Sequence, residues 1–161
     1  MQEALIVCRE THIPAPPAAV FALLTDPDKI LRWMGTEAQI DAHPGGLYLV
    51  NVTGARCARG TFREVVPVHR LAYSFGWDDS KEVPPGSSLV EIDLIDRDGG
   101  TLLRMTHSGL PNAEQCASHN EGWAHYMGRL TRRASGQDPG PDVFPKSSDN
   151  ERGGHAAPAA S

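Results

Sequence analysis

The sequence lacks the features that mark several large classes of protein. It has three cysteines, Cys8, Cys57 and Cys116, an odd number without close pairing, which favours a reducing cytoplasm over a disulfide framework. No apolar run approaches the roughly 20 residues of a membrane-spanning helix. The first ten residues also lack the basic, apolar and small-residue regions of a signal peptide. We therefore expect a cytoplasmic protein with no membrane partner.

Basic residues are scarce as well. Fifteen Lys and Arg against 20 Asp and Glu give a formal net charge of -5, whereas a nucleic-acid-binding surface usually shows a basic excess. The one locally basic cluster, at 129–133, is interpreted as a solvated helix face, because cations suit the carboxyl end of a helix. We expect no nucleic-acid partner.

Catalytic signatures are missing too. The chain has no nucleophile elbow, Walker loop, dinucleotide fingerprint or HExxH motif. We therefore assign no catalytic residue and no cofactor from sequence motifs.

One long helical pattern is present, at 112–134. Small or apolar residues recur there at spacings of three and four, which places them along one side of a helix. They are Cys116, His119, Trp123, Met127, Leu130 and Ala134. The opposite side carries Glu114, Glu121, Arg129, Arg132 and Arg133. A helix with one apolar stripe needs a surface to pack on.

Strand-like segments that precede this helix can supply that surface. Alternating apolar residues and turn signals predict seven strands, at 4–13, 36–41, 47–53, 58–66, 71–77, 89–95 and 101–108. Two short helices follow the first strand, beginning at Pro17 and at Asp26–Pro27. Consecutive hairpin signals make the sheet antiparallel. We predict an α+β fold in which a curved antiparallel sheet of about seven strands wraps around the long helix.

The composition changes after Ser135. Residues 136–161 are rich in Pro, Gly, Ser and Ala, and Val143 and Phe144 are their only sizeable apolar residues. Such a segment buries too little surface to offset the entropy of ordering. We predict one domain at 1–135 and a disordered tail at 136–161.

Several short segments, in this order, resemble a known family. They are PAPPAAVF at 14–21, LTDP at 24–27 with Trp33, GG at 45–46, GTFREVVP at 60–67 with Arg70 and Leu71, TH at 106–107 and GW at 122–123. Their order and spacing over residues 4–134 resemble the START-like (SRPBCC) superfamily and, within it, the AHSA-like homologues of the activator of a heat-shock chaperone ATPase. This resemblance implies the helix-grip fold of the birch-pollen allergen. It also implies a cavity between the last helix and the sheet that holds a small apolar or aromatic molecule.

The family name further implies chaperone activation. The eukaryotic activators grip the chaperone through a separate N-terminal domain, for which this chain of 161 residues has no room. We therefore expect no chaperone contact, and we leave a homodimer open.

Strand parity and the helix stripe direct a set of side chains toward the space between helix and sheet. The candidate ligand-binding residues are Tyr48, Phe62, Glu64, Tyr73, Phe75, Trp77, Met105, His107, His119, Trp123 and Met127. A filled core uses the same residue types, so this pattern predicts either a cavity wall or a plain core.

Glu64 shares strand parity with Phe62 and Val66, so its carboxylate is expected to point inward. It would then be a polar anchor or an acid with a raised pKa, or, the reading we favour, a structural carboxylate with a local partner. His107 and His119 could approach a metal together with Cys116, but close-spaced ligand motifs are missing, so we predict no metal site.

Three functions remain open from the sequence, and one of them, a module that interacts with a chaperone and activates its ATPase, rests on the family name alone. The first is a binding module for a small hydrophobic molecule, as the resemblance implies. The alternative is an enzyme of the polyketide cyclase or aromatase kind, which needs an acid–base pair that only Glu64, Tyr73 and His107 could provide.

Overall fold

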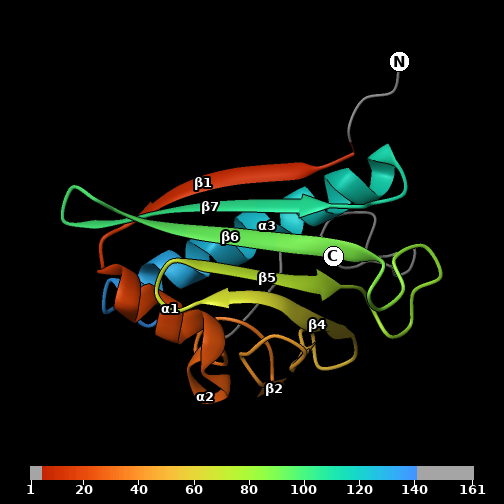
Figure 1. Cartoon of the computed structure of the whole chain (residues 1–161), viewed down its shortest axis with the longest axis horizontal. Helices are drawn as coiled ribbons and strands as arrows, with labels where there is room; N and C mark the ends of the chain where they lie inside the picture. The colour runs from red at the N-terminus through yellow and green to blue at the C-terminus, as the bar shows by residue number, and fades with distance from the viewer. Residues whose placement is uncertain (1–4, 141–161) are drawn as a thin grey trace.

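A computed structural model describes residues 5–140 of the chain (Figure 1). Every predicted strand and helix is present, with ends that differ by a few residues. The elements are β1 (Val7–Ile13), α1 (Pro17–Thr25), α2 (Pro27–Ile30), β2 (Glu37–Ile40), β3 (Leu47–Asn51), β4 (Cys57–Val66), β5 (Arg70–Phe75), β6 (Ser88–Arg97), β7 (Gly100–Ser108) and α3 (Ala113–Ala134).

The strands form one antiparallel sheet in the order β1-β7-β6-β5-β4-β3-β2. The β6–β7 hairpin closes at the pair Arg97 and Gly100, around Asp98 and Gly99, which both have left-handed backbone angles. In Figure 1, α3 runs behind the sheet, while α1 and α2 lie at one end. This is the predicted helix-grip fold.

Local capping positions the helices. The Asn112 side chain accepts a hydrogen bond from the backbone N–H of Gln115 at 2.9 Å, which satisfies a free donor in the first turn of α3. The Asp26 carboxylate likewise accepts from the N–H groups of Asp28 and Lys29, and Pro27 begins α2. These caps fix where α2 and α3 begin and therefore which of their side chains face the sheet.

The prediction that Glu64 points inward is wrong. Strand β4 has an irregularity in its pairing with β5 between Phe62 and Glu64, and an extra residue reverses the side-chain alternation beyond it. The Glu64 carboxylate is therefore 49% exposed and pairs with the Arg70 guanidinium at 2.8 Å. Val66, which was expected to share the inner face, is 40% exposed, and Val65 packs against the core instead.

The interpretation of 129–133 as a solvated face is wrong at Arg129. This side chain is 7% exposed, and its Nε donates to the backbone carbonyl of Trp33 at 2.8 Å. Its other nitrogens donate to the carbonyls of Pro139 and Gly140. Arg129 therefore joins α3 to the end of α2 and to the chain that follows α3.

Most of the predicted disordered tail lies outside the described residues. Of that stretch, the structure describes 136–140, which includes the two carbonyls bound by Arg129. Between residues 5 and 140, no helix has both the length and the apolar character needed to cross a membrane.

Candidate functional site

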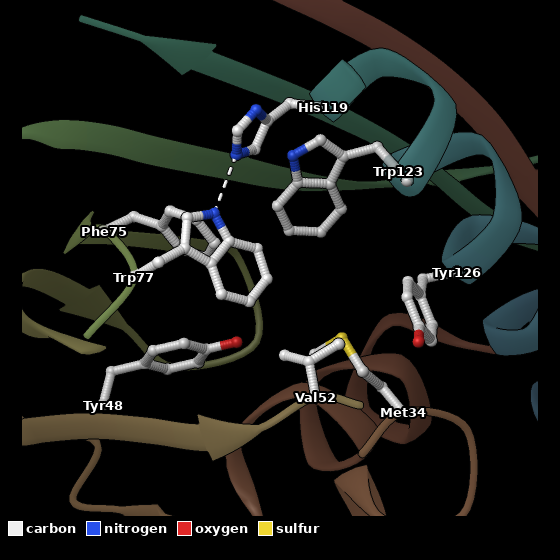
Figure 2. A pocket seen from close by; sticks show the side chains of 9 residues that line it. Met34, Tyr48, Val52, Phe75, Trp77, His119, Trp123 and Tyr126 are labelled. Atoms are coloured by element: carbon white, nitrogen blue, oxygen red, sulfur yellow. Dashed lines mark hydrogen bonds between the residues drawn. The ribbon is translucent and has the colours of Figure 1, made fainter. Parts of the chain in front are cut away.

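A small cavity lies between α3 and the inner face of the sheet, with a volume of about 30 Å³. Figure 2 shows its lining side chains converging from β3, β5, α3 and the turn after α2. The lining residues are Met34, Tyr48, Val52, Phe75, Trp77, His119, Gly122, Trp123 and Tyr126. None of them carries a fixed charge, and the cavity wall is mostly aromatic.

His119 is held in one neutral tautomer on the α3 side of the cavity. Its Nδ1 lies 2.8 Å from the backbone carbonyl of Gln115, which can only accept, so Nδ1 carries the proton. Its Nε2 therefore accepts the Trp77 indole N–H at 3.0 Å, the dashed contact in Figure 2. Both ring nitrogens are satisfied only while the imidazole is neutral.

His107 is held in the opposite tautomer. Its Nδ1 accepts the Trp123 indole N–H at 3.0 Å, so the proton of the neutral ring lies on Nε2. That nitrogen is 2.8 Å from the Ser88 hydroxyl, which in turn donates to the Phe75 carbonyl. Both ring nitrogens of His107 are therefore used in hydrogen bonds, and neither has a proton or lone pair left for a ligand.

Burial lowers the pKa of both histidines. For His119, burial and the nearby Arg56 outweigh the Gln115 hydrogen bond and bring the pKa to about 4. For His107, burial and the neighbouring His119 hold the pKa well below 6.5. The two rings lie 5.2 Å apart and perpendicular, so a charge on one disfavours a charge on the other.

Three aromatic side chains support the opposite wall. Tyr48 stacks on Tyr73 with ring centroids 4.1 Å apart, and Phe62 meets both rings edge-on. Burial raises the pKa of Tyr48 to about 12 and also raises that of Tyr73, so both phenols stay protonated. Tyr48 reaches the cavity, whereas Tyr73 and Phe62 stand behind it.

Trp77 is fixed from outside as well as from within. The Arg56 guanidinium lies 4.5 Å from the centre of its ring system, a cation–π contact. Arg56 is itself held by Asp79 at 3.0 Å. The ring is therefore held by its N–H on one side and by a positioned cation on the other.

The structure brings together part of the predicted site. Five of the predicted residues line the cavity: Tyr48, Phe75, Trp77, His119 and Trp123. Phe62 and Tyr73 contact Tyr48 from behind, and His107 contacts Phe75, His119 and Trp123. Met105 and Met127 are buried in the core without lining the cavity. Glu64 lies on the outer face.

Four lining residues were not predicted, namely Met34, Val52, Gly122 and Tyr126. Tyr126 lies seven residues after His119, so extending the helix periodicity by one more row would have found it. Val52 shares strand parity with Tyr48 in the predicted strand 47–53, so that parity could have found it. Met34 lies in the turn after α2, and no local pattern places it beside α3.

Acid–base chemistry has little support in this geometry. Both histidines use each ring nitrogen for a structural hydrogen bond, and Glu64 is outside with Arg70. Within residues 5–140, no group of three or more His, Cys, Asp or Glu side chains is arranged to hold a metal ion.

A long helix gripped by a seven-stranded antiparallel sheet, with an aromatic cavity between them, defines a helix-grip protein. The family model described as "Activator of Hsp90 ATPase homolog 1-like protein" matches residues 14–135. The chain therefore belongs to this family, and the resemblance to the START-like superfamily is confirmed.

Solved structures agree with this assignment. An AHSA1-like protein from Rhizobium etli, solved by NMR, is 74% identical over 91% of this chain and 94% of its own, with a TM-score of 0.71. The Aha1 dimer from Colwellia psychrerythraea is 16% identical over 80% of this chain and 95% of its own, with a TM-score of 0.71.

DynU16, a protein of the dynemicin biosynthetic locus, is 23% identical over 85% of this chain, with a TM-score of 0.74. This chain spans about half of DynU16, 50% of its length. At these identities, DynU16 and the Colwellia protein show the fold alone. No curated protein matches the chain.

Proposed function

We propose that the protein binds a small, uncharged aromatic or apolar molecule in the cavity under α3. The observation that carries this proposal is the composition of the wall. Five aromatic residues line the cavity, and the two tryptophans among them have their N–H groups bound to histidines, so they offer apolar ring surface to a ligand. A charged ligand would meet no opposite charge among the lining residues, and burying it would be costly.

The cavity must expand to accept such a molecule. A volume of about 30 Å³ holds little more than one or two waters, whereas a cavity of roughly 150 Å³ lined by apolar residues accepts benzene. Met34 is the most adaptable lining side chain, because methionine is unbranched and has three rotatable bonds. We propose that Met34 changes rotamer as the ligand enters.

Tryptophan fluorescence tests the proposal, because the chain has three tryptophans and two of them line the cavity. In Trp33→Phe, all tryptophan emission comes from Trp77 and Trp123, and titration with a small aromatic ketone such as 1-indanone should quench it saturably. In the matched control Trp77→Phe/Trp123→Phe, the remaining Trp33 lies outside the cavity lining, and quenching should stay linear with concentration.

The melting temperature gives a second test that does not depend on tryptophan fluorescence. Bound 1-indanone should raise the melting temperature of the wild-type protein with concentration. If no member of a panel of bicyclic aromatic compounds moves the melting temperature, and both variants quench alike, the binding proposal is wrong.

The cyclase-like alternative is not supported. The acid–base pair that it required is divided between the two faces of the sheet, with Glu64 outside and His107 buried against Trp123. The similarity to DynU16 is too low to carry an activity across.

Self-association is proposed separately. The Colwellia relative was solved as a dimer, and a homodimer of this chain stays a prediction, which light scattering across a range of concentrations would test. The expectation of no chaperone contact also stays a prediction, and co-purification with a chaperone would contradict it.

A further inference from the structure

The polar groups of the cavity wall show which ligand chemistry the site accepts. On the α3 side, the indole N–H groups of Trp77 and Trp123 are each taken by a histidine. The remaining nitrogens of those histidines are bound to Gln115 and Ser88. A ligand therefore finds no available donor or acceptor in these two Trp–His pairs.

The opposite wall differs because two hydroxyls meet there. Tyr48 and Tyr73 stack with ring centroids 4.1 Å apart, so their hydroxyls are neighbours. Each phenol carries one O–H proton that it can donate. Within residues 5–140, the Tyr48 hydroxyl makes no hydrogen bond of good geometry, so its proton is available to a ligand.

The position of Tyr48 directs that proton into the cavity. Tyr48 lines the space, and Figure 2 shows its oxygen pointing toward the region between Trp77 and Val52. Tyr73 lies behind it in a near-parallel stack, with an interplanar angle of 20°. A buried donor without a partner is destabilising, so a group that accepts from it is favoured over pure hydrocarbon.

We infer that the ligand is a small planar molecule with an uncharged hydrogen-bond acceptor, such as a ketone oxygen, which accepts a hydrogen bond from the Tyr48 hydroxyl. This inference rests on the proposed function, because it names the chemistry of the molecule bound in the same cavity. A carboxylate is disfavoured, because no lining residue carries a positive charge to offset its burial.

The test compares two rigid molecules of nearly identical shape, indane and 1-indanone, which differ by a carbonyl in place of one CH₂ group. Calorimetric or fluorescence titration gives the ratio of their affinities. In Tyr48→Phe, the ratio should shift against the ketone by roughly two- to twelvefold, the range expected for one hydrogen bond. The stacked ring is retained in this variant, so the cavity wall is preserved.

Two further variants separate the hydroxyls. Tyr126→Phe removes the other phenol oxygen of the lining and should leave the ratio unchanged. Tyr73→Phe should also leave it unchanged, because Tyr48 then keeps its own proton to donate. In the wild-type protein, the carbonyl stretch of bound 1-indanone should move to lower wavenumber than in hexane, a readout that does not depend on a variant folding.

The two proposals fail in different ways. If both compounds bind but the affinity ratio is the same in wild type and Tyr48→Phe, this inference is overturned and the binding function stands. If the ratio changes in Tyr126→Phe instead, the acceptor contact belongs to Tyr126 and the inference is likewise overturned. If neither compound binds, the proposed function and this inference fall together.

Discussion

Two buried histidines lie beside a cavity, and both are held neutral by tryptophans. In each pair the indole donates to an imidazole nitrogen that must be unprotonated. Protonation of either ring would place two donors against each other and leave a charge in the core. Because these two buried residues are histidines, the stability of the folded protein should depend on pH.

The folded state should lose stability in mild acid. The pKa of His119 is lowered from 6.5 to about 4, so between these values the unfolded chain binds more protons than the folded one. Stability is then full above about pH 6.5, falls as the pH drops and levels off below about pH 4. The shift corresponds to about 3 kcal/mol for this residue, and urea unfolding at a series of pH values would measure it.

His119→Gln supplies the control for that prediction. The variant should be less stable at pH 7.5 but should lose less stability on acidification, so the difference from wild type narrows toward pH 4. His43→Gln, at a side chain that is 61% exposed, should leave the acid-induced loss in place. Parallel curves for wild type and His119→Gln would contradict the assignment.

Arg129 is a charged side chain that is buried, with only 7% of its surface exposed. Replacing it with Met keeps an unbranched stem but leaves the buried carbonyl of Trp33 without its donor. We expect a loss of about 1–3 kcal/mol in the free energy of unfolding. Arg132→Met changes an exposed residue of the same helix and should stay within about 0.5 kcal/mol of wild type. Equal effects would show that the Arg129 contacts do not stabilise the fold.

At the level of elements, the sequence was sufficient for most of the architecture. Proline and glycine mark the ends of strands and helices, and period-two alternation identifies β3 and β6. These signals are local, so they can be read without knowing the tertiary structure. Consecutive hairpins account for the pairings from β2 to β7, whereas the pairing of β1 with β7 joins the first strand to the last and was not predicted.

The errors share a physical cause. The irregularity after Phe62 reverses the alternation in β4, and no residue type announces it, so Glu64 was assigned to the wrong face. Arg129 is buried because backbone carbonyls from distant segments satisfy its guanidinium. The volume of the cavity depends on how Met34 and Val52 pack against α3, and a pattern within one segment cannot specify that.

Helix α3 offers a prediction of its own through Gly128. This residue is exposed in the middle of the helix, and a Cβ added to it would meet nothing within 4 Å. Gly128→Ala should therefore raise the free energy of unfolding by about 1 kcal/mol. Asn112→Ala, which removes the side-chain cap of the same helix, should lower it by about 1 kcal/mol. Thermal and urea unfolding check both, and a destabilised Gly128→Ala would show that the glycine serves another purpose.

At the scale of the whole molecule, α3 and the sheet form two layers that are joined by specific contacts but are incompletely packed at the cavity between them. The Arg129 and Trp33 contact ties α3 to the turn after α2, and the Trp77 and His119 bond ties it to the segment after β5. Between these ties, the wall of the cavity has no charged residue to recruit water strongly. Such a hollow costs stability, because its lining atoms lose contacts that a filled core would make.

If the hollow is kept for a ligand, filling it should raise stability and weaken binding. Val52→Ile adds one methylene to a lining residue beside about 30 Å³ of space, so it should gain up to about 0.8 kcal/mol while reducing the affinity for 1-indanone. Val50→Ile makes the same change two residues earlier, at a fully buried position beside Gly35 that does not line the cavity. That control should lose about 1–3 kcal/mol through overpacking. A Val52→Ile variant that is more stable and binds as tightly as wild type would show that the ligand occupies another part of the fold.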